Sequence, residues 1–444
     1  MGWTKITLWK RVIIGLVLGL ILGLALRYGM GPGPGGEGFA SVAFGETWLF
    51  PFGDAFVRLI KMLVVPLIFV TLVSGVTAMG DPAKIGGLGA RTIGLYMVTT
   101  FFAVALGLAM GTIFQPGVGV EFETASSGAV DSVTQRLEAG AAAADASFLT
   151  KLFDIIPANI VRAMATGDTG IVLQIIFFAI LFGISCLLAG EAARPVVKVV
   201  ESATEVMLKM TVMIMELAPI GVFFLMAFVM ATRGLGVLDN LGLLAIALYS
   251  ACFLHMIFVH GLLIVKGILN LPLARFFGGI RDAQAVAFST ASSAGTLPVT
   301  ITNVTENLGV KKSVAASVLP VGATINMDGT AIYLGIVALF AAQAIGIDLT
   351  PGMYVSVALA ATLTSIGAAA IPSAGLLLAA AVLSVIGVSE EQSVLIIAFI
   401  FPFDRLLDMM RTVTNVTGDA AVASAVAKWE GELNEHVFRE QAAV

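Results

Sequence analysis

The chain has 444 residues, of which 58% are hydrophobic and 12% are charged, and its formal net charge is −5. Soluble domains carry about 25% charged residues, so this composition excludes a soluble globular enzyme. It also excludes a disordered chain, which would be poor in apolar residues. The net negative charge argues against a nucleic-acid partner. Cys186 and Cys252 lie in apolar runs and suggest neither a disulfide framework nor a metal cluster. The composition predicts an α-helical protein that crosses a membrane several times.

Long apolar runs in the first part of the chain predict spanning helices, each of which needs about 20 apolar residues. The runs cover residues 12–26, 62–80, 92–120, 169–190, 210–232 and 240–265. Basic residues before the first run place the N-terminus in the cytoplasm, and the loops that follow then alternate between the two sides. Residues 121–147 hold five acidic residues and one arginine, which predicts an external, flexible loop.

Two charge-free segments further along the chain are interrupted by small residues. Residues 283–305 contain the run STASSAGTLP, and residues 349–389 contain SIGAAAIPSAG. Such runs hold a continuous helix poorly, and broken backbone at membrane depth occurs only inside protein or against water. Both segments are therefore predicted to be re-entrant hairpins that enter from opposite faces. Each precedes a full span, and the two spans carry related pentads at residues 326–330 and 415–419. An inverted repeat of this kind points to a transporter site near the membrane midplane.

The last predicted span, residues 392–428, carries a stripe of polar side chains. An ionisable group at the membrane centre costs roughly 2.5–3.5 kcal/mol. At about 100° per helical residue, an arc of about 80° contains Asp404, Asp408, Arg411, Asn415 and Asp419. The stripe is either a structural ladder of ion pairs or a ligand-lined surface. Asp408 suits an ammonium group and Arg411 suits a carboxylate, so the second interpretation predicts a zwitterionic, acidic substrate.

Further polar residues suggest donors for a second carboxylate and ligands for cations. The hairpin tips offer backbone N–H groups, to which Ser292 and Ser293 add hydroxyls, although small residues lining a cavity would give the same pattern. Asp328 and Asp419 stand beside Gly, Asn and Thr with no basic residue nearby in sequence, which suggests hard cations bound by oxygen.

Three hydroxyl residues and two histidines are less informative on their own. Tyr96, Thr99 and Thr100 share a helix face, where ordinary hydrogen bonding between helices is the default explanation. His255 and His260 are predicted to be helix-packing residues, since no acidic partner lies near them in the sequence.

These motifs resemble the dicarboxylate/amino acid:cation symporter family. The resemblance is strongest over SSAGTLPVT (292–300), LPVGATINMDGT (319–330), SIGAAAIPSAG (365–375) and DMMRTVTNVTGD (408–419), and residues 51–66 look like the second helix of the family. It implies an all-α polytopic membrane protein with eight transmembrane helices, two re-entrant hairpins and inverted repeats. It also implies an elevator-type transporter that assembles as a homotrimer.

The resemblance further implies a division into a scaffold and a mobile transport domain. Scaffold helices 1 and 2 would occupy residues 1–80, transport-domain helix 3 residues 88–118, and an external loop with scaffold helices 4 and 5 residues 119–232. Residues 239–430 would form the transport-domain core, with helix 6, hairpin 1 (about 283–308), helix 7 (about 311–346), hairpin 2 (about 351–388) and helix 8 (about 392–428). Residues 431–444 would be a cytoplasmic tail.

Residue roles carried over from the family are implied by the resemblance alone. The implied substrate-binding residues are Ser292, Ser293, Thr330, Ala374, Gly375, Asp408, Arg411, Thr412 and Asn415. One implied sodium site uses Gly322, Asn326, Asn415 and Asp419, a second uses Tyr96, Thr99, Thr100, Asn326 and Asp328, and a third uses Thr324, Ser365, Ile366 and Ala368.

The sequence departs from the family at three positions. Leu334 stands where the animal proteins carry a Glu linked to proton and potassium coupling, and Ala291 and Met409 stand where relatives often place a second Arg. Arg405 is a candidate substitute for that Arg. The acid at Asp408 favours an amino acid over a C4-dicarboxylate.

The resulting prediction is a symporter, not an enzyme, that carries glutamate or aspartate inward with sodium ions and uses no organic cofactor. Its expected location is the inner membrane, in contact with the lipid bilayer, with both termini cytoplasmic. The alternatives are proton coupling, a C4-dicarboxylate substrate or, more remotely, an intramembrane aspartyl protease. The protease would need a Gly-x-Gly-Asp motif, and Val416 stands at the first Gly position. A channel fits less well, because a site that combines an acid with an Arg suits binding and release.

Overall fold

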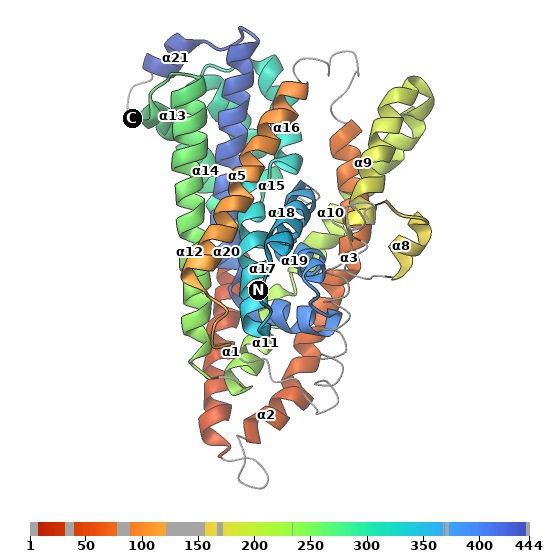
Figure 1. The fold of residues 1–444 in the computed structure, drawn as a ribbon, viewed down its shortest axis with the longest axis vertical. Helices are drawn as coiled ribbons and strands as arrows, with labels where there is room; N and C mark the ends of the chain where they lie inside the picture. Colours follow the sequence, from red (N-terminus) through yellow and green to blue (C-terminus); the bar gives the residue numbers. More distant parts are fainter. Residues whose placement is uncertain are drawn as a thin grey trace, which may run out of the picture.

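The structure is a computed structural model, and it describes residues 8–31, 40–77, 89–120, 156–166, 172–232, 234–366, 368 and 373–440. Within these ranges every regular element is helical, apart from one isolated bridge between Val310 and Leu433. The helices form an elongated bundle, and most of the long ones follow its long axis (Figure 1). The predicted external loop at residues 121–147 lies outside the described residues.

The helices of the first part of the chain are α1 (Leu8–Gly29), α2 (Ala40–Phe44), η3 (Gly45–Leu49), α3 (Phe50–Thr77), α5 (Ala90–Phe114), α8 (Ile160–Thr166), α9 (Val172–Ala189), η6 (Gly190–Ala193), α10 (Arg194–Met215) and α11 (Ala218–Thr232). Those of the second part are α12 (Val237–His255), η7 (Met256–Ile268), α13 (Leu273–Gly279), α14 (Arg281–Thr290), α15 (Ser293–Thr302), η8 (Asn303–Asn307), α16 (Lys312–Ile325), α17 (Asp328–Ile345), α18 (Pro351–Ile366), α19 (Ala374–Val385), α20 (Glu390–Trp429) and α21 (Glu435–Glu440). Of these, η3, η7 and η8 are π-helices and η6 is a 3₁₀-helix.

Five helical stretches among the described residues are long and apolar enough to cross a membrane. They are Lys10–Gly29, Ala90–Phe114, Gln174–Met215, Leu238–Ile268 and Lys312–Ile345. The span expected at residues 210–232 is divided, because α10 ends at Met215 and α11 begins at Ala218. Glu216, in the break, accepts a hydrogen bond of 2.7 Å from Arg11. Pro219 follows in the first turn of α11, where a helix needs no N–H donor.

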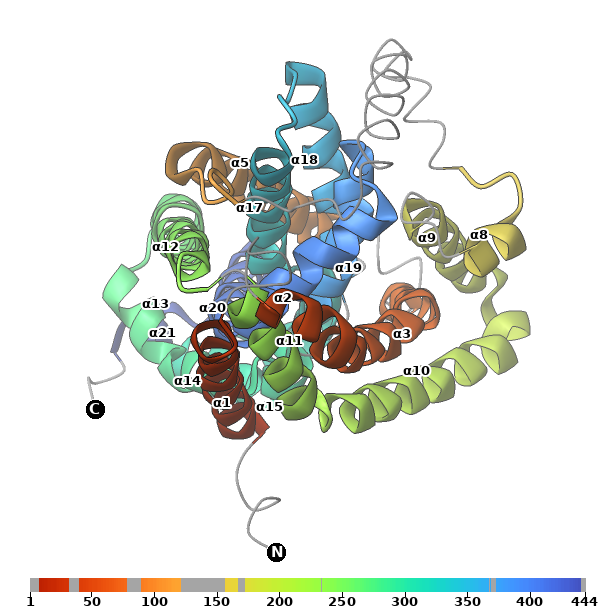
Figure 2. The ribbon, with the colours of Figure 1, turned by 90° about the horizontal axis from the view of Figure 1, so that it is seen from below.

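Glycines bring α1 against α11, and the two helices lie side by side (Figures 1 and 2). Gly15, Gly19 and Gly23 form a stripe with a four-residue repeat, and a Cβ at any of them would overlap a backbone carbonyl of α11. Small residues at this spacing let membrane helices approach closely. The absence of side chains at these three positions therefore allows α1 to pack closely against α11.

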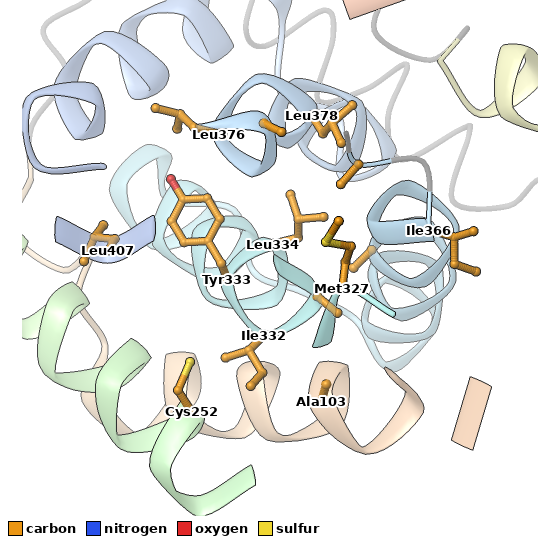
Figure 3. Packing of buried hydrophobic residues seen from close by; sticks show 14 of the residues in the cluster. Ala103, Cys252, Met327, Ile332, Tyr333, Leu334, Ile366, Leu376, Leu378 and Leu407 are labelled. Atoms are coloured by element: carbon orange, nitrogen blue, oxygen red, sulfur yellow. The ribbon is translucent and has the colours of Figure 1, made fainter. Parts of the chain in front are cut away.

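The helix α17 lies at the centre of the bundle and contacts α5, α12, α18, α19 and α20. Its residues from Asp328 to Ala342 are all buried. Figure 3 shows Tyr333 and Leu334 of α17 lying close to Leu376 and Leu378 of α19, with Leu407 of α20 beside the Tyr333 ring. A helix that is apolar on nearly every side is stable only away from water, and here other helices surround it.

Both segments predicted as hairpins are pairs of adjoining helices. The helix α14 ends at Thr290 and is capped by Ala291, which has a left-handed backbone with a φ of 51°, and α15 follows at once with Ser292 as its N-cap. The pair α18 and α19 is likewise interrupted after Ile366, and Ser373 has a φ of 63°. The members of each pair contact each other. Their re-entrant path across a bilayer stays a prediction, as do the scaffold and transport-domain boundaries.

Candidate functional site

The polar stripe of α20 is buried in the protein. Its five members are at most 6% exposed, and they are Asp404, Asp408, Arg411, Asn415 and Asp419. Arg405, which lies outside the arc, is also buried, and its Nη2 atom donates to the carbonyl oxygen of Thr290 over 2.9 Å. Thr290 is the last residue of α14. The break between α14 and α15 is thereby tied to the charged stretch of α20.

Arg411 is the centre of the charged cluster. Its Nη2 atom donates to Asp404 Oδ1 over 2.9 Å and to Asp408 Oδ1 over 2.8 Å. The guanidinium also lies 4.0 Å from the centroid of the Tyr333 ring. Although Arg411 is fully buried, its Nε and Nη1 atoms have no hydrogen-bond partner among the described residues. Buried donors without partners cost free energy, so these two atoms mark a place where a ligand would stabilise the protein.

Asp408 and the start of α19 lie beside the guanidinium group of Arg411. Asp408 Oδ2 accepts a hydrogen bond of 2.7 Å from the backbone N–H of Ser373. A Cβ at Gly375 would lie 3.0 Å from Arg411 Nη1 and 3.0 Å from Thr330 Cγ2, so glycine keeps open the space beside the unpartnered donor. The structure thus brings together four predicted substrate residues, Thr330, Gly375, Asp408 and Arg411.

The other predicted substrate residues have local roles. Thr412 Oγ1 donates to the backbone carbonyl of Asp408 over 2.9 Å, and Ser292 Oγ accepts from the N–H of Gly295 over 3.0 Å as the cap of α15. Asn415 Oδ1 accepts from the N–H of Gly329 over 2.7 Å, which joins α20 to α17. Ser293 and Ala374 are buried at the first positions of α15 and α19.

A cluster of oxygen atoms surrounds Asp328, and these atoms belong to residues of the second predicted sodium site. Asp328 Oδ1 lies 2.9 Å from Thr100 Oγ1 and 3.3 Å from Thr99 Oγ1. The Thr99 hydroxyl is also 3.4 Å from Asn326 Oδ1 and 3.0 Å from the carbonyl oxygen of Tyr96. Carboxylate, amide, hydroxyl and carbonyl oxygens are the ligands that hard cations prefer.

A second oxygen cluster adjoins the first through Asn326. The Nδ2 atom of Asn326 donates to Asp419 Oδ1 over 2.9 Å. A Cβ at Gly322 would overlap both Asp419 Oδ1 and the Tyr96 hydroxyl, so only glycine leaves this space open. With Asn415 one helical turn from Asp419, the four residues of the first predicted sodium site lie together.

The residues of the third predicted sodium site do not form a cluster of free oxygen ligands. The Thr324 hydroxyl donates to Val321 O over 3.0 Å, and the Ser365 hydroxyl donates to Thr362 O over 2.9 Å, so both serve their own helices. Thr324, Ile366 and Ala368 instead line an apolar cavity of about 490 Å³, which α3 and α9 line from the other side.

His255 and His260 were predicted to be helix-packing residues without an acidic partner near them in the sequence, but the fold gives them one in Asp328. Their Nε2 atoms lie 3.1 Å and 2.9 Å from Asp328 Oδ2, and all three side chains are fully buried. The acid lies 73 and 68 residues further along the chain, so a search for partners close in sequence could not find it. The five-residue spacing of the histidines is the one local signal that they share a partner. A spacing of five places two side chains near one face of a π-helix but not of an α-helix.

Comparison with known proteins identifies the family. The sequence profile of the "Sodium:dicarboxylate symporter family" matches residues 8–429. The "Proton/sodium-glutamate symport protein" of Bacillus subtilis (strain 168) is 37% identical over 388 residues, which cover 87% of either chain. The "C4-dicarboxylate transport protein" of Azorhizobium caulinodans is 36% identical over 390 residues, covering 88% of this chain and 84% of the relative. The chain therefore belongs to the sodium:dicarboxylate symporter family and is a multi-pass membrane transporter, not an enzyme.

Proposed function

We propose that this protein is a secondary-active symporter that carries glutamate or aspartate into the cell together with sodium ions. The proposal includes eight transmembrane helices with two re-entrant hairpins, a homotrimer in the inner membrane, cytoplasmic termini and elevator-type movement of the transport domain. The observation that carries it is the pair of unpartnered donors on the buried Arg411, next to the carboxylate of Asp408.

The charged cluster offers one group to each end of a small zwitterion. Asp408 would bind the ammonium group, and Arg411 would bind the side-chain carboxylate through donors that the protein leaves unused. Asp404 would remain paired with Arg411 throughout, since it is fully buried and lies 2.9 Å away. Asp408 would turn from Arg411 to the ammonium group and keep the hydrogen bond from the backbone N–H of Ser373, which would link the substrate to the start of α19.

Charge balance supports cation coupling. The described core of the site holds four carboxylates, those of Asp328, Asp404, Asp408 and Asp419, and two guanidinium groups, those of Arg405 and Arg411. An acidic amino acid adds further net negative charge. Uncompensated charge is costly away from water, so cations bound at the two oxygen clusters would allow the loaded site to cross the membrane interior.

A C4-dicarboxylate is the second candidate, and Arg405 is the observation that favours it. Its Nε and Nη1 atoms also lack partners among the described residues, so a second guanidinium is available to a second carboxylate. The relative from Azorhizobium caulinodans is named a C4-dicarboxylate transport protein. Asp408 argues for the amino acid, because a dicarboxylate brings no ammonium group to this buried acid.

The test is uptake by the purified protein in liposomes. Labelled aspartate, glutamate and succinate are offered separately under an inward sodium gradient, an inward proton gradient or an outward potassium gradient. We expect sodium-driven accumulation of aspartate or glutamate. Accumulation driven by protons without sodium would contradict the assignment of sodium as the coupling ion. Preference for succinate would contradict the assignment of an amino acid as the substrate.

A further inference from the structure

Two histidines converge on one oxygen of Asp328 inside the protein. His255 ends α12 and His260 lies in the π-helix η7, and their rings meet edge to face with centroids 4.6 Å apart. Residues five apart point in different directions on an α-helix, whereas the i→i+5 hydrogen bonding of a π-helix brings them close to one face. π-helical turns are rare and often occur at functional sites. The helix geometry here delivers both imidazoles to the same carboxylate.

The carboxylate of Asp328 is divided between two environments. Oδ2 faces His255 and His260 at 3.1 Å and 2.9 Å. Oδ1 faces the hydroxyls of Thr99 and Thr100 at 3.3 Å and 2.9 Å. A carboxylate oxygen only accepts hydrogen bonds, so both imidazoles meet Oδ2 through Nε2–H. The carboxylate plane is thereby fixed with its second oxygen directed into the oxygen cluster.

The ring nitrogens on the far side argue against a transition metal held between the histidines. The Nδ1 atoms of His255 and His260 have no hydrogen-bond partner among the described residues. A histidine that ligates a metal almost always donates its second N–H to another group. A neutral imidazole that donates through Nε2 carries only a lone pair at Nδ1, so neither ring has a second N–H to donate.

We propose that His255 and His260 are positioning residues for a sodium ion bound at Asp328. They hold Oδ2 so that Oδ1 is presented to the cation, and they set how tightly the oxygen cluster binds sodium. This inference rests on the proposed function, since it needs a transported cation at that cluster. Groups that orient a metal ligand in this way typically change metal affinity roughly 10–100-fold when they are removed.

Gly418 gives a second way to disturb this region. It lies in α20, where a Cβ would stand 2.9 Å from His260 Nε2 and 2.7 Å from Asn326 Nδ2. A side chain at this position would press on His260 and also on Asn326, which is itself a predicted sodium ligand. Replacement of Gly418 should therefore weaken sodium binding through both contacts, and the histidine variants are the ones that isolate the role of His255 and His260.

The experiment measures sodium half-saturation of aspartate uptake in liposomes at saturating aspartate. His255→Leu and His260→Leu remove the N–H donor, whereas His255→Gln and His260→Gln retain one at similar reach. We expect the Leu variants and Gly418→Ala to raise the sodium half-saturation concentration roughly 10–100-fold, and the Gln variants to recover most of that loss. Cys252→Ala is the matched control, since Cys252 is buried in α12 one turn before His255.

Sodium-dependent thermal stabilisation of the purified variants gives a second readout that does not require transport. A role in packing alone would lower the maximal rate or the melting temperature and leave the sodium half-saturation unchanged. That result, or Gln variants as impaired as Leu variants, would overturn the positioning role. Absence of sodium-driven uptake in the wild type would instead overturn the proposed function, so the two failures are distinguishable.

Discussion

Arg411 binds two carboxylates of its own helix, and the two have different surroundings. Asp404 is fully buried, whereas Asp408 is 6% exposed and also accepts a hydrogen bond from the backbone of Ser373. Removing one partner of a buried ion pair is costly because the other charge is left uncompensated. Since Arg411 has two partners, it keeps one when Asp408 turns to a substrate. Because Asp404 also pairs with Arg411, Asp408 can leave Arg411 and bind the ammonium group of a substrate.

Asp408→Asn tests this exchange. The amide retains an oxygen for the N–H of Ser373 but loses the charge that attracts an ammonium group. Loss of a buried charged partner costs about 3 kcal/mol, or roughly a hundredfold in affinity, and we expect aspartate uptake in liposomes to fall accordingly. Asp54→Asn is the control, because Asp54 forms a 2.6 Å ion pair with the exposed Arg58. Unaltered aspartate affinity in the Asp408 variant would exclude the ammonium role.

Arg411→Cys tests the other end of the substrate. The variant removes the donors Nε and Nη1 and leaves a smaller, uncharged side chain beside Thr330 and Gly375. We expect uptake of aspartate and glutamate to be lost and uptake of small neutral amino acids to be gained, both measured by competition against labelled substrates. An aspartate affinity equal to that of the wild type would contradict the assignment.

Single-residue predictions from the sequence succeeded where one helix supplied all the information. The alignment of the polar residues on one face of α20 follows from helical periodicity, whereas their burial does not, because residues 407–427 are buried on every face of the helix. The pairing of His255 and His260 with Asp328 depends on how α12 packs against α17 and how η7 packs against α20, which periodicity does not report. The same limit applies to Arg405, whose contact with Thr290 depends on the position of α14.

At the scale of helices, composition located the breaks better than it located the spans. Small residues predicted the interruption at Ala291, because a left-handed residue and a capping serine end one helix and begin the next. The interruption of the run at residues 210–232 was missed, although Pro219 is a local signal for it, and Glu216 in the break pairs with Arg11, which is 205 residues away. Hydropathy records apolar length and does not record such distant partners.

The packing of α1 on α11 gives a prediction at this scale. Gly19→Ala places a methyl group against the backbone carbonyl of Phe223, which cannot move without shifting the helix. Overpacking of this kind costs about 1–3 kcal/mol, so we expect a lower melting temperature in detergent. In Gly94→Ala the added methyl meets nothing within 4 Å, and its stability should be unchanged or higher. Equal melting temperatures for the two variants would mean that α1 does not pack closely on α11.

At the scale of the whole molecule, α3 and α9 face α5, α16 and α18 across the apolar cavity. Figure 2 shows α3, α9 and α10 along one side of the molecule, away from α5 and α12. The cavity is lined by α3 and α9 from one side and by α5, α16 and α18 from the other. Its apolar lining contains few directional contacts, so sliding of one group past the other breaks few hydrogen bonds there. This arrangement is compatible with the proposed elevator movement.

A reversible cross-link across this boundary tests that movement. A Cβ at Gly75 in α3 would lie 3.7 Å from the Cβ of Thr324 in α16, within the usual range of about 3.5–4.5 Å for a disulfide. In a background with Cys186→Ala and Cys252→Ala, we expect oxidation of the Gly75→Cys/Thr324→Cys pair to stop aspartate uptake and reduction to restore it. The reduced protein supplies the baseline, so any effect of losing the Thr324 hydroxyl cancels.

The matched control is a cross-link within one group. A Cβ at Gly279 would lie 3.4 Å from the Cβ of Asn307, just below that range, and 2.6 Å from Leu308 Cδ2, which would have to shift; both cross-linked residues belong to the stretch proposed to move as one body. Oxidation of the Gly279→Cys/Asn307→Cys pair should leave uptake unchanged, because no relative movement is blocked. Full uptake by the oxidised Gly75–Thr324 pair, with the disulfide confirmed by mass spectrometry, would show that α3 and α16 stay together during transport. An elevator movement between them would then be excluded.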